Sequence, residues 1–338
     1  MKKKWGTMLL IILLLIGGTG TIILWQNSFD MVQRAVQIDT LQGQLTGVLT
    51  LPVKYSRKVG LVLFIHGDGP IDATHNDGYK PLWERLAGLG YASLSLNKRG
   101  IGGSEGSWLD QRMDDRVEEA RQALAWARQQ PEIDASRIGV WGASQAGWVI
   151  PKLAGKERLA FSILVSPAIN WLTQGEYNTR SEMAKEGRPM NEIEQQVNEN
   201  NRIKKLLIAG SSYEEYVSLA GQEDAMSSER WRFVSRNYTA DATNDIANFE
   251  SPVLLMLGDQ DTNVDVQETE RVYREHVSPS ELLQVKLLPD TEHSMLSVST
   301  AESPARALLI SLFVPRNITV KGYIDEIEDF LRSITPKK

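Results

Sequence analysis

The feature that most constrains the fold is a regular alternation of apolar runs with stretches of helical period. Patterns typical of strands lie at residues 60–65, 91–96, 137–141, 160–165, 252–258 and 283–288, and the run at 60–65 is continuously apolar, as expected of a buried strand. Helical patterns lie at residues 81–89, 114–130, 146–153, 266–276 and 324–334. Parallel strands need crossover connections, and helices supply these on both faces of a sheet. The alternation therefore predicts an α/β fold with a mostly parallel sheet, preceded by a strand pair at 32–52.

The alternation stops between residues 169 and 250. This stretch is polar, mostly helix-forming and carries scattered aromatic residues. It predicts a helical cap or lid inserted into a core formed by residues 29–168 and 251–338. Since ligands bind at the carboxyl ends of parallel strands, we expect the insertion to lie over or beside that edge.

The first 28 residues form a segment of different character. Lysines at positions 2–4 precede an uncharged run at residues 7–25. A helix of this length matches the hydrocarbon core of a bilayer. We expect a transmembrane anchor, with a cleaved signal peptide as the alternative. The lysines favour the cytoplasmic side, so the rest of the chain is expected outside the cytoplasm, either anchored or secreted.

The composition narrows the possible partners and cofactors. The formal net charge of −6 lacks the basic excess that nucleic-acid binding needs, and the absence of cysteine excludes thiolate chemistry. Residues 259–270 imitate a calcium loop, but Val264 stands where the turn needs glycine. Residues 99–106 imitate a dinucleotide fingerprint without its third glycine, and no histidines have zinc-ligand spacing. We expect no nucleic acid, no metal and no cofactor.

A single serine stands where an apolar run meets a helical stretch. Ser144, in the sequence VWGASQAGW, has small neighbours at Gly142, Ala146 and Gly147. A sharp strand-to-helix turn exposes a serine hydroxyl beside backbone N–H groups, and the crowding of that turn requires small residues. The pattern indicates a nucleophile elbow. A helix N-cap serine packed among small residues is the alternative.

A base and an acid follow later apolar runs. His293 follows the run at 283–288, and both Asp259 and Asp261 follow the run at 252–258. The chain order serine, aspartate, histidine is the one that accompanies a nucleophile elbow of this kind. The spacing from the preceding glycine favours Asp261 as the acid, with Asp259 as a turn residue.

The loop after the first buried run is placed to supply a backbone donor. Gly67 and Gly69 let the chain turn so that an amide faces a developing oxyanion. The N–H groups of Asp68 and Gln145 are the expected donors. We expect His66 to pack under the loop and hold it by hydrogen bonds, rather than to act as the catalytic base.

Five stretches together carry a resemblance to a known family: HGDGP, LNKRGIGGSEG, RIGVWGASQAGW, LGDQDTNV and LPDTEHSM. In this order they resemble the α/β-hydrolases, close to the branch with dienelactone-hydrolase-like and acyl-thioesterase-like enzymes. The resemblance implies the α/β-hydrolase fold, with the nucleophile at Ser144, the acid at Asp261 and the base at His293. Two positions depart from the family pattern. Ala146 stands where glycine is usual, and Asp68 stands where small or uncharged residues are more frequent.

These observations predict a serine hydrolase that cleaves small-molecule carboxylic esters through an acyl-enzyme, with thioesters and lactones as neighbouring substrates. A serine exopeptidase or amidase on the same fold is the first alternative, and a catalytically silent surface-anchored binding protein is the second. We expect the cap to set substrate choice. Its candidate pocket residues are Trp171, Tyr213 and Trp231. The natural substrate and the oligomeric state stay open.

Overall fold

The computed structural model describes residues 17–334, and this part of the chain contains one sheet of eight strands. The strands are β1 (Val32–Thr40), β2 (Gly43–Leu51), β3 (Val59–Ile65), β4 (Tyr91–Leu96), β5 (Ile133–Ala143), β6 (Ser162–Val165), β7 (Val253–Gly258) and β8 (Leu283–Leu288). Their order across the sheet is β1-β2-β4-β3-β5-β6-β7-β8. Strands β3 to β8 pair in parallel, and β2 pairs antiparallel with β1 and β4. The predicted, mostly parallel α/β sheet is confirmed.

The burial of the strands explains why their sequences are so uniformly apolar. Every residue of β3 and of β7 is buried, because helices cover both faces of the parallel part of the sheet. In β2, by contrast, buried residues alternate with partly exposed ones over most of the strand. The continuous apolar runs of the sequence therefore mark the parallel centre of the sheet.

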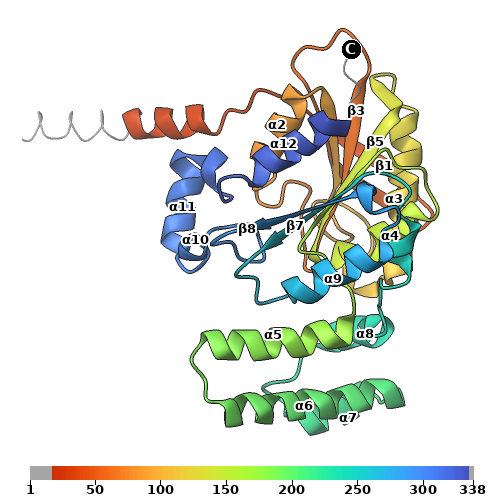
Figure 1. Ribbon diagram of the computed structural model, residues 1–338, viewed down its shortest axis with the longest axis vertical. Coiled ribbons are helices and arrows are strands. Elements are labelled where there is room, and N and C mark those ends of the chain that lie inside the picture. The colour runs from red at the N-terminus through yellow and green to blue at the C-terminus, as the bar shows by residue number, and fades with distance from the viewer. Residues whose placement is uncertain (1–16, 335–338) are drawn as a thin grey trace, which may run out of the picture.

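Helices cover the sheet on both faces (Figure 1). On one face, α2 (Lys80–Gly88) and α12 (Tyr323–Ile334) pack with alternate residues of β3, Val62 and Phe64. On the other face, α3 (Met113–Arg128), α4 (Ile150–Ala154) and α9 (Val266–His276) share a core with Leu61, Leu63 and Ile65. Short 3₁₀ turns lie at Trp108–Asp110, Asp245–Asn248, Ser280–Leu282 and Pro315–Asn317.

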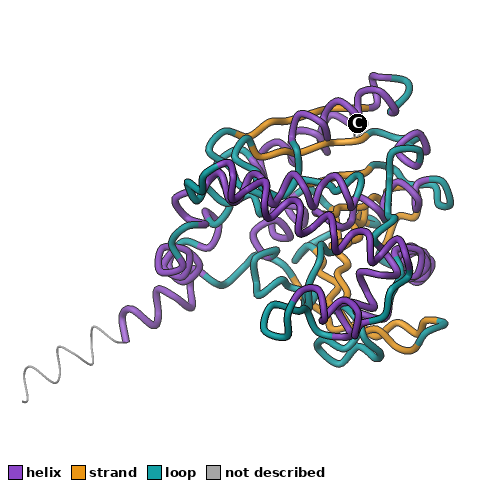
Figure 2. Tube along the Cα trace, turned by 90° about the horizontal axis from the view of Figure 1, so that it is seen from below, coloured by secondary structure: helices purple, strands orange, loops and turns teal. Residues whose placement is uncertain are grey.

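Four helices separate β6 from β7 along the chain: α5 (Trp171–Lys185), α6 (Met190–Ala209), α7 (Tyr213–Ala220) and α8 (Ser228–Asn237). Figure 1 shows them gathered beyond one end of the sheet, with α5 and α8 next to the core and α6 and α7 farther away. In Figure 2, which looks at the molecule from that end, helices lie in front of the strands. We call residues 169–250 the cap.

Two segments differ from the sequence prediction. The helix predicted over 146–153 is a 3₁₀ turn at Ser144–Trp148 followed by the short helix α4. Gly147 in this turn lies so close to the backbone of Ala168 that an added Cβ would clash with it. Two helices were not predicted, α10 (Val298–Ala301) and α11 (Pro304–Phe313). Helix α11 buries none of its residues and exposes Leu308 and Leu309, so it has no apolar face turned toward the core from which to infer it.

The prediction of an N-terminal transmembrane helix is wrong for the part of the chain that the structure describes. Within residues 17–334, no helix is long and apolar enough to cross a membrane. Residues 17–26 are helical and mostly exposed, and their glycines and threonines lower the hydropathy of that stretch. The remainder of the predicted run, together with the three lysines, lies outside the described residues.

Candidate active site

Ser144 lies on a strained turn at the carboxyl end of β5. Its φ is 53°, in the left-handed region that residues other than glycine rarely adopt. The turn leaves no room for larger neighbours. A Cβ on Gly142 would lie 2.6 Å from the Cβ of Ala146, and one on Gly147 would lie 2.2 Å from the Ala168 oxygen. Packing at a sharp strand-to-helix turn thus requires the small residues found here.

A histidine and an aspartate are hydrogen-bonded beyond the ends of β8 and β7. His293 Nδ1 donates to Asp261 Oδ2 at 2.9 Å. Asp261 Oδ1 accepts from the N–H groups of Asn263 (2.7 Å) and Val264 (3.0 Å), and its side chain is fully buried. Because Nδ1 carries the donated proton, Nε2 is the ring nitrogen that can accept one. Strands β5, β7 and β8 run in parallel, so Ser144 follows the same edge of the sheet.

The second acid after β7, Asp259, has a different environment. It is exposed, and its Oδ1 accepts from the N–H of Thr291 at 3.2 Å. This bond ties the turn after β7 to the loop after β8. Only Asp261 of the two aspartates pairs with His293.

His66 is a buried structural residue. Its Nε2 donates to Leu96 O at 2.7 Å, and its Nδ1 accepts from the Tyr79 hydroxyl at 3.2 Å. Burial is the main cause that lowers the pKa of His66 to about 3. The ring is therefore neutral at physiological pH with both nitrogens occupied, which leaves it unable to serve as a base.

The loop of Gly67, Asp68 and Gly69 lies against the serine. A Cβ on Gly67 would be 3.4 Å from the Cβ of Ser144. Gly69 has a φ of 98°, which an L side chain rarely adopts. We call residues 66–69 the oxyanion loop, after the role that the sequence suggests for them.

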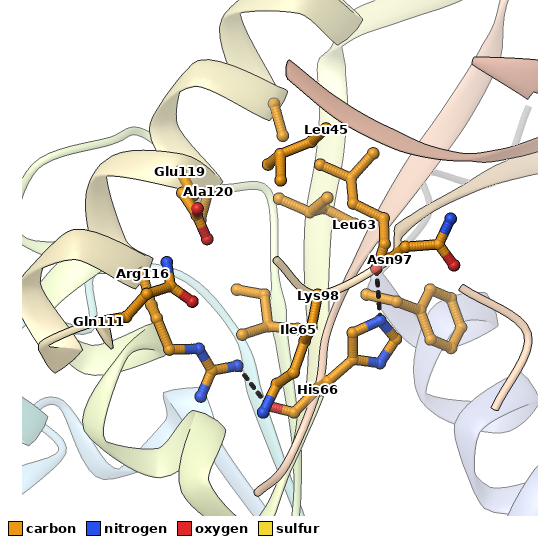
Figure 3. Close-up of a pocket in the computed structure, with 13 residues that line it drawn as sticks. Leu45, Leu63, Ile65, His66, Asn97, Lys98, Gln111, Arg116, Glu119 and Ala120 are labelled. Atoms are coloured by element: carbon orange, nitrogen blue, oxygen red, sulfur yellow. Dashed lines mark hydrogen bonds between the residues drawn. The ribbon is translucent and has the colours of Figure 1, made fainter. Parts of the chain in front are cut away.

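Two buried cations hold the oxyanion loop from beneath (Figure 3). Lys98 Nζ donates to Gly67 O at 2.6 Å, and Arg116 donates to His66 O at 2.5 Å. Arg116 also donates to Gln145 Oε1 at 2.5 Å. Burial lowers the pKa of both cations, and their mutual repulsion adds to the effect on Lys98. The cavity of about 60 Å³ in Figure 3 lies among these residues and is not lined by the serine.

The cap reaches the oxyanion loop through an ion pair. The two terminal nitrogens of Arg230, on α8, donate to the Asp68 carboxylate at 3.1 and 2.6 Å. Gln145 Nε2 donates to the same carboxylate at 3.0 Å. Burial disfavours the charged form of Asp68, but the hydrogen bonds and charge of Arg230 outweigh burial and hold the pKa of Asp68 below its usual value. The guanidinium also lies over the rings of Phe233 and Trp108.

A pocket of about 360 Å³ opens at the elbow. It is lined by Asp68, Ser144, Gln145, Trp148, Ala168, Trp171, Gln174, Gly175, Asn178, Glu182, Arg230 and Asn263. Of the three aromatic candidates in the cap, Trp171 lines this pocket, whereas Tyr213 and Trp231 do not. Trp231 is buried and stacks on Tyr216 at 4.3 Å, because the cap needs an apolar core of its own. The Tyr213 hydroxyl donates to Met226 O.

Sequence reasoning missed Lys98, Arg116 and Arg230. Lys98 follows β4 within the LNKRG stretch, where a basic residue directly after a buried strand is a usable signal. Arg116 lies among the buried residues of α3, next to Val117 and one turn before Ala120. A charge on an apolar helix face indicates a buried partner. No sequence signal distinguishes Arg230 from the other arginines of the cap.

The family of the chain follows from a match to a family model. The model Hydrolase_4, described as serine aminopeptidase, S33, matches residues 56–298. The match covers well over half of the chain, so the protein belongs to this family of α/β-hydrolases. A comparison with curated proteins gives no match.

Solved structures of low sequence identity share the fold. An esterase of Pyrococcus furiosus is 17% identical with a TM-score of 0.57, covering 90% of this chain and 92% of its own. An esterase of Pyrobaculum calidifontis is 14% identical with a TM-score of 0.56, covering 94% and 90%. Est1E from Butyrivibrio proteoclasticus, with ferulic acid bound, is 17% identical with a TM-score of 0.55, covering 88% and 98%.

The packing of the elbow predicts that Gly142→Ala destabilises the protein by about 1–3 kcal/mol, because the added methyl overpacks the turn. Urea unfolding measures the difference. Gly88→Ala is the matched control, since a Cβ at this exposed helical glycine meets nothing within 4 Å. We expect the control to unfold at an equal or higher urea concentration than the wild type. An unchanged midpoint for Gly142→Ala contradicts this account of the elbow.

Proposed function

We propose that the protein is a serine hydrolase that cleaves carboxylic esters of small molecules. Ser144 is the nucleophile, His293 is the general base and acid, and Asp261 orients the imidazole. The 2.9 Å hydrogen bond between Asp261 and His293, at the sheet edge that also carries the elbow, is the observation that carries the proposal. Membership of a hydrolase family supports it.

The chemistry runs in two halves. His293 Nε2 takes the proton of the Ser144 hydroxyl as the serine oxygen attacks the ester carbonyl. The imidazolium then gives its proton to the departing alcohol, and an acyl-enzyme remains. In the second half, His293 takes a proton from water, which attacks the acyl group and releases the acid. Asp261 stabilises the imidazolium in both halves and stays ionised.

The negative charge that develops on the carbonyl oxygen needs donors held in place beforehand. The N–H groups of Asp68 and Gln145 are the proposed donors. The peptide unit that carries the Asp68 N–H also carries Gly67 O, which accepts the hydrogen bond from Lys98. A charged donor on the carbonyl draws electron density from the same amide. Lys98 therefore strengthens the N–H as a donor and fixes its direction.

Ester hydrolysis is the first candidate because an alcohol leaves a tetrahedral intermediate more easily than an amine does. Thioesters and lactones follow the same steps. Amide hydrolysis is the second candidate, favoured by the description of the family as serine aminopeptidases. A catalytically silent binding protein is disfavoured, since the structure keeps a buried acid paired with a histidine.

The location outside the cytoplasm stays a prediction. It rests on the lysines at residues 2–4, which precede the apolar run and favour the cytoplasmic side. We retain the alternative in which a signal peptide within residues 1–28 is cleaved and the rest of the protein is secreted.

Removal of the nucleophile tests the mechanism directly. We expect Ser144→Ala to lose on the order of 10⁶-fold in turnover of p-nitrophenyl acetate and to lose labelling by a small fluorophosphonate. Circular dichroism and urea unfolding check that the fold is kept. Retention of a tenth of the wild-type rate would falsify the assignment of Ser144.

The two aspartates after β7 give a matched pair of substitutions. Asp261→Asn removes the charge that orients and stabilises the imidazolium, and we expect on the order of a 10⁴-fold loss in kcat. Asp259→Asn changes an exposed turn residue and is expected to keep kcat within about threefold. Steady-state kinetics of the two variants measure these losses. A larger loss of kcat in Asp259→Asn than in Asp261→Asn would assign the role of the acid to Asp259.

Substitution of Lys98 tests whether its hydrogen bond to Gly67 O polarises the peptide unit that carries the Asp68 N–H. We expect Lys98→Met to lower kcat on the order of tenfold with little change in KM, because the effect falls on the developing oxyanion. Lys98→Arg keeps the charge and restores part of the rate. Burial lowers the pKa of Lys98, so the wild-type rate falls as pH rises through that pKa, whereas the arginine variant keeps its rate to higher pH.

The control for this experiment is Lys152→Met, which removes a surface lysine paired with Asp114. Equal losses of kcat in both lysine variants, or a loss confined to KM in Lys98→Met, contradict the polarised peptide. Unfolding by urea is measured beside the kinetics, and the pH profile separates catalysis from a structural effect.

A further inference from the structure

The cap helix nearest to Ser144 turns a polar stripe toward the pocket. Trp171, Gln174, Asn178 and Glu182 follow each other at three- and four-residue spacings on α5, which places them on one face of the helix. All four line the pocket at the elbow. Three of the four are hydrogen-bonding side chains. A cap that received an aliphatic chain would carry leucine, isoleucine or phenylalanine at such positions.

Gln174 is the clearest sign that the pocket is built for a ligand. Its Oε1 is buried and has no hydrogen-bond partner. A buried amide without a partner costs about 1–3 kcal/mol, so such groups are normally satisfied. Gln174 lines the pocket, so a ligand hydroxyl would satisfy this oxygen once the side-chain amide turns toward the cavity. An alkyl chain at the same place would leave the amide unpaired and would complete its desolvation.

Asn178 offers a second oxygen from the next turn of α5. Its Nδ2 donates to Thr262 O at 3.2 Å and to Asn263 Oδ1 at 3.1 Å. These two bonds hold the amide against the loop that carries Asp261. Since the nitrogen is occupied, the oxygen is the end of the amide that remains for a ligand donor.

The single aromatic residue of the stripe does not make the pocket apolar. Trp171 stacks on Trp148 at 4.8 Å and lies 6.0 Å from the ring of Phe233. The ring is therefore engaged by other rings of the protein, and it is only partly exposed. It serves mainly to dock α5 on the core.

The charged residues that line the pocket disfavour negatively charged substrates as well as positively charged ones. Asp68 and Arg230 neutralise each other, and Glu182 has no ion-pair partner within residues 17–334. A carboxylate on the substrate would meet the Glu182 charge. An ammonium group near the serine would meet the field of Lys98 and Arg116, the two buried cations beneath the oxyanion loop. Neutral hydroxyl groups are compatible both with the Glu182 carboxylate and with the cations near the serine.

We infer that the pocket binds a neutral, hydroxyl-bearing part of an ester, as in esters of polyols, sugars or hydroxy acids, with Gln174 and Asn178 as its hydrogen-bonding residues. The inference rests on the proposed function, because it places this group beside the reacting serine. This inference replaces the expectation that aromatic residues of the cap line the pocket. The selectivity it predicts is for hydroxylated over aliphatic esters of equal size.

Two matched substrate pairs test the inference with the full-length wild-type protein. Glyceryl butyrate against propyl butyrate varies the alcohol, and p-nitrophenyl 3-hydroxybutyrate against p-nitrophenyl butyrate varies the acyl group. We expect the hydroxylated member of at least one pair to have a kcat/KM at least fivefold higher, mainly through KM. We expect Gln174→Leu to abolish or reverse that preference.

The matched control is Gln196→Leu, which makes the same change at an exposed position on α6 away from the pocket. It should keep the wild-type preference. Two further acyl groups, succinyl and 4-trimethylammoniobutyryl in their p-nitrophenyl esters, test charge. The inference is overturned by an aliphatic preference in both pairs, by a preference for either charged ester, or by Gln174→Leu leaving the ratios unchanged.

A binding measurement separates this inference from the proposed function. The affinities of Ser144→Ala for glyceryl butyrate and propyl butyrate, and for the 3-hydroxybutyrate and butyrate esters, are compared by calorimetry. Tighter binding of a hydroxylated member supports the pocket even if the wild type fails to hydrolyse p-nitrophenyl acetate, a result that would end the esterase proposal alone. Normal hydrolysis with tighter binding of both aliphatic members ends the pocket inference alone.

Discussion

The hydrogen bonds from buried cations to the carbonyl oxygens of the oxyanion loop are the interaction on which the site depends. In a peptide unit the N–H and the C=O point in opposite directions. If an N–H is to face the serine, its carbonyl must face the interior, where an unpaired oxygen costs about 1–3 kcal/mol. Lys98 meets that requirement at Gly67, whose carbonyl shares a peptide unit with the Asp68 N–H, and Arg116 satisfies the preceding carbonyl of His66. In the proposed mechanism, the bond from Lys98 that satisfies the core also directs the Asp68 N–H toward the substrate.

Burying two cations side by side is unfavourable unless a negative charge lies near them. Burial lowers the pKa of both Lys98 and Arg116, and two carboxylates act against it: Glu119 is the stronger influence on Arg116, and Asp68 is the stronger influence on Lys98. This gives a physical reason for an acidic residue in a loop where the family pattern favours small or uncharged ones. The carboxylate is itself neutralised by Arg230 of the cap, so its charge does not stand free before the substrate.

The sequence was most informative where a position must satisfy a general rule. The strands at 91–96 and 283–288 were predicted to the residue. The first is buried in the sheet, and the second is a partly exposed edge strand in which apolar residues alternate with Gln284 and Lys286. The Ser144 elbow and the pair of Asp261 and His293 came from chain order and strand ends. Asp261 could be preferred to Asp259 but not secured, since only the folded loops show which carboxylate reaches the histidine.

The contributions that sequence did not reveal depend on pairs of residues far apart in the chain. Arg116 and Gln145 lie on different elements, as do Arg230 and Asp68, and no spacing links them. The prediction of a transmembrane helix failed for a different reason: within the described residues, only 17–25 of the predicted run are present, and no helix there is long and apolar enough to cross a membrane. Helix α11 was missed because it buries no apolar face against the core.

The cap shows why aromatic content is a poor guide to the character of a pocket. A small group of helices needs its own apolar core, and the largest side chains are the ones that supply it. Trp231 and Tyr216 stack with each other inside the cap, and Trp171 docks α5 on Trp148. With the rings used for stability, the face of α5 toward the serine is left to polar residues. Recognition of substrate and stability of the cap thus reside in different side chains, so the first can vary without loss of the second.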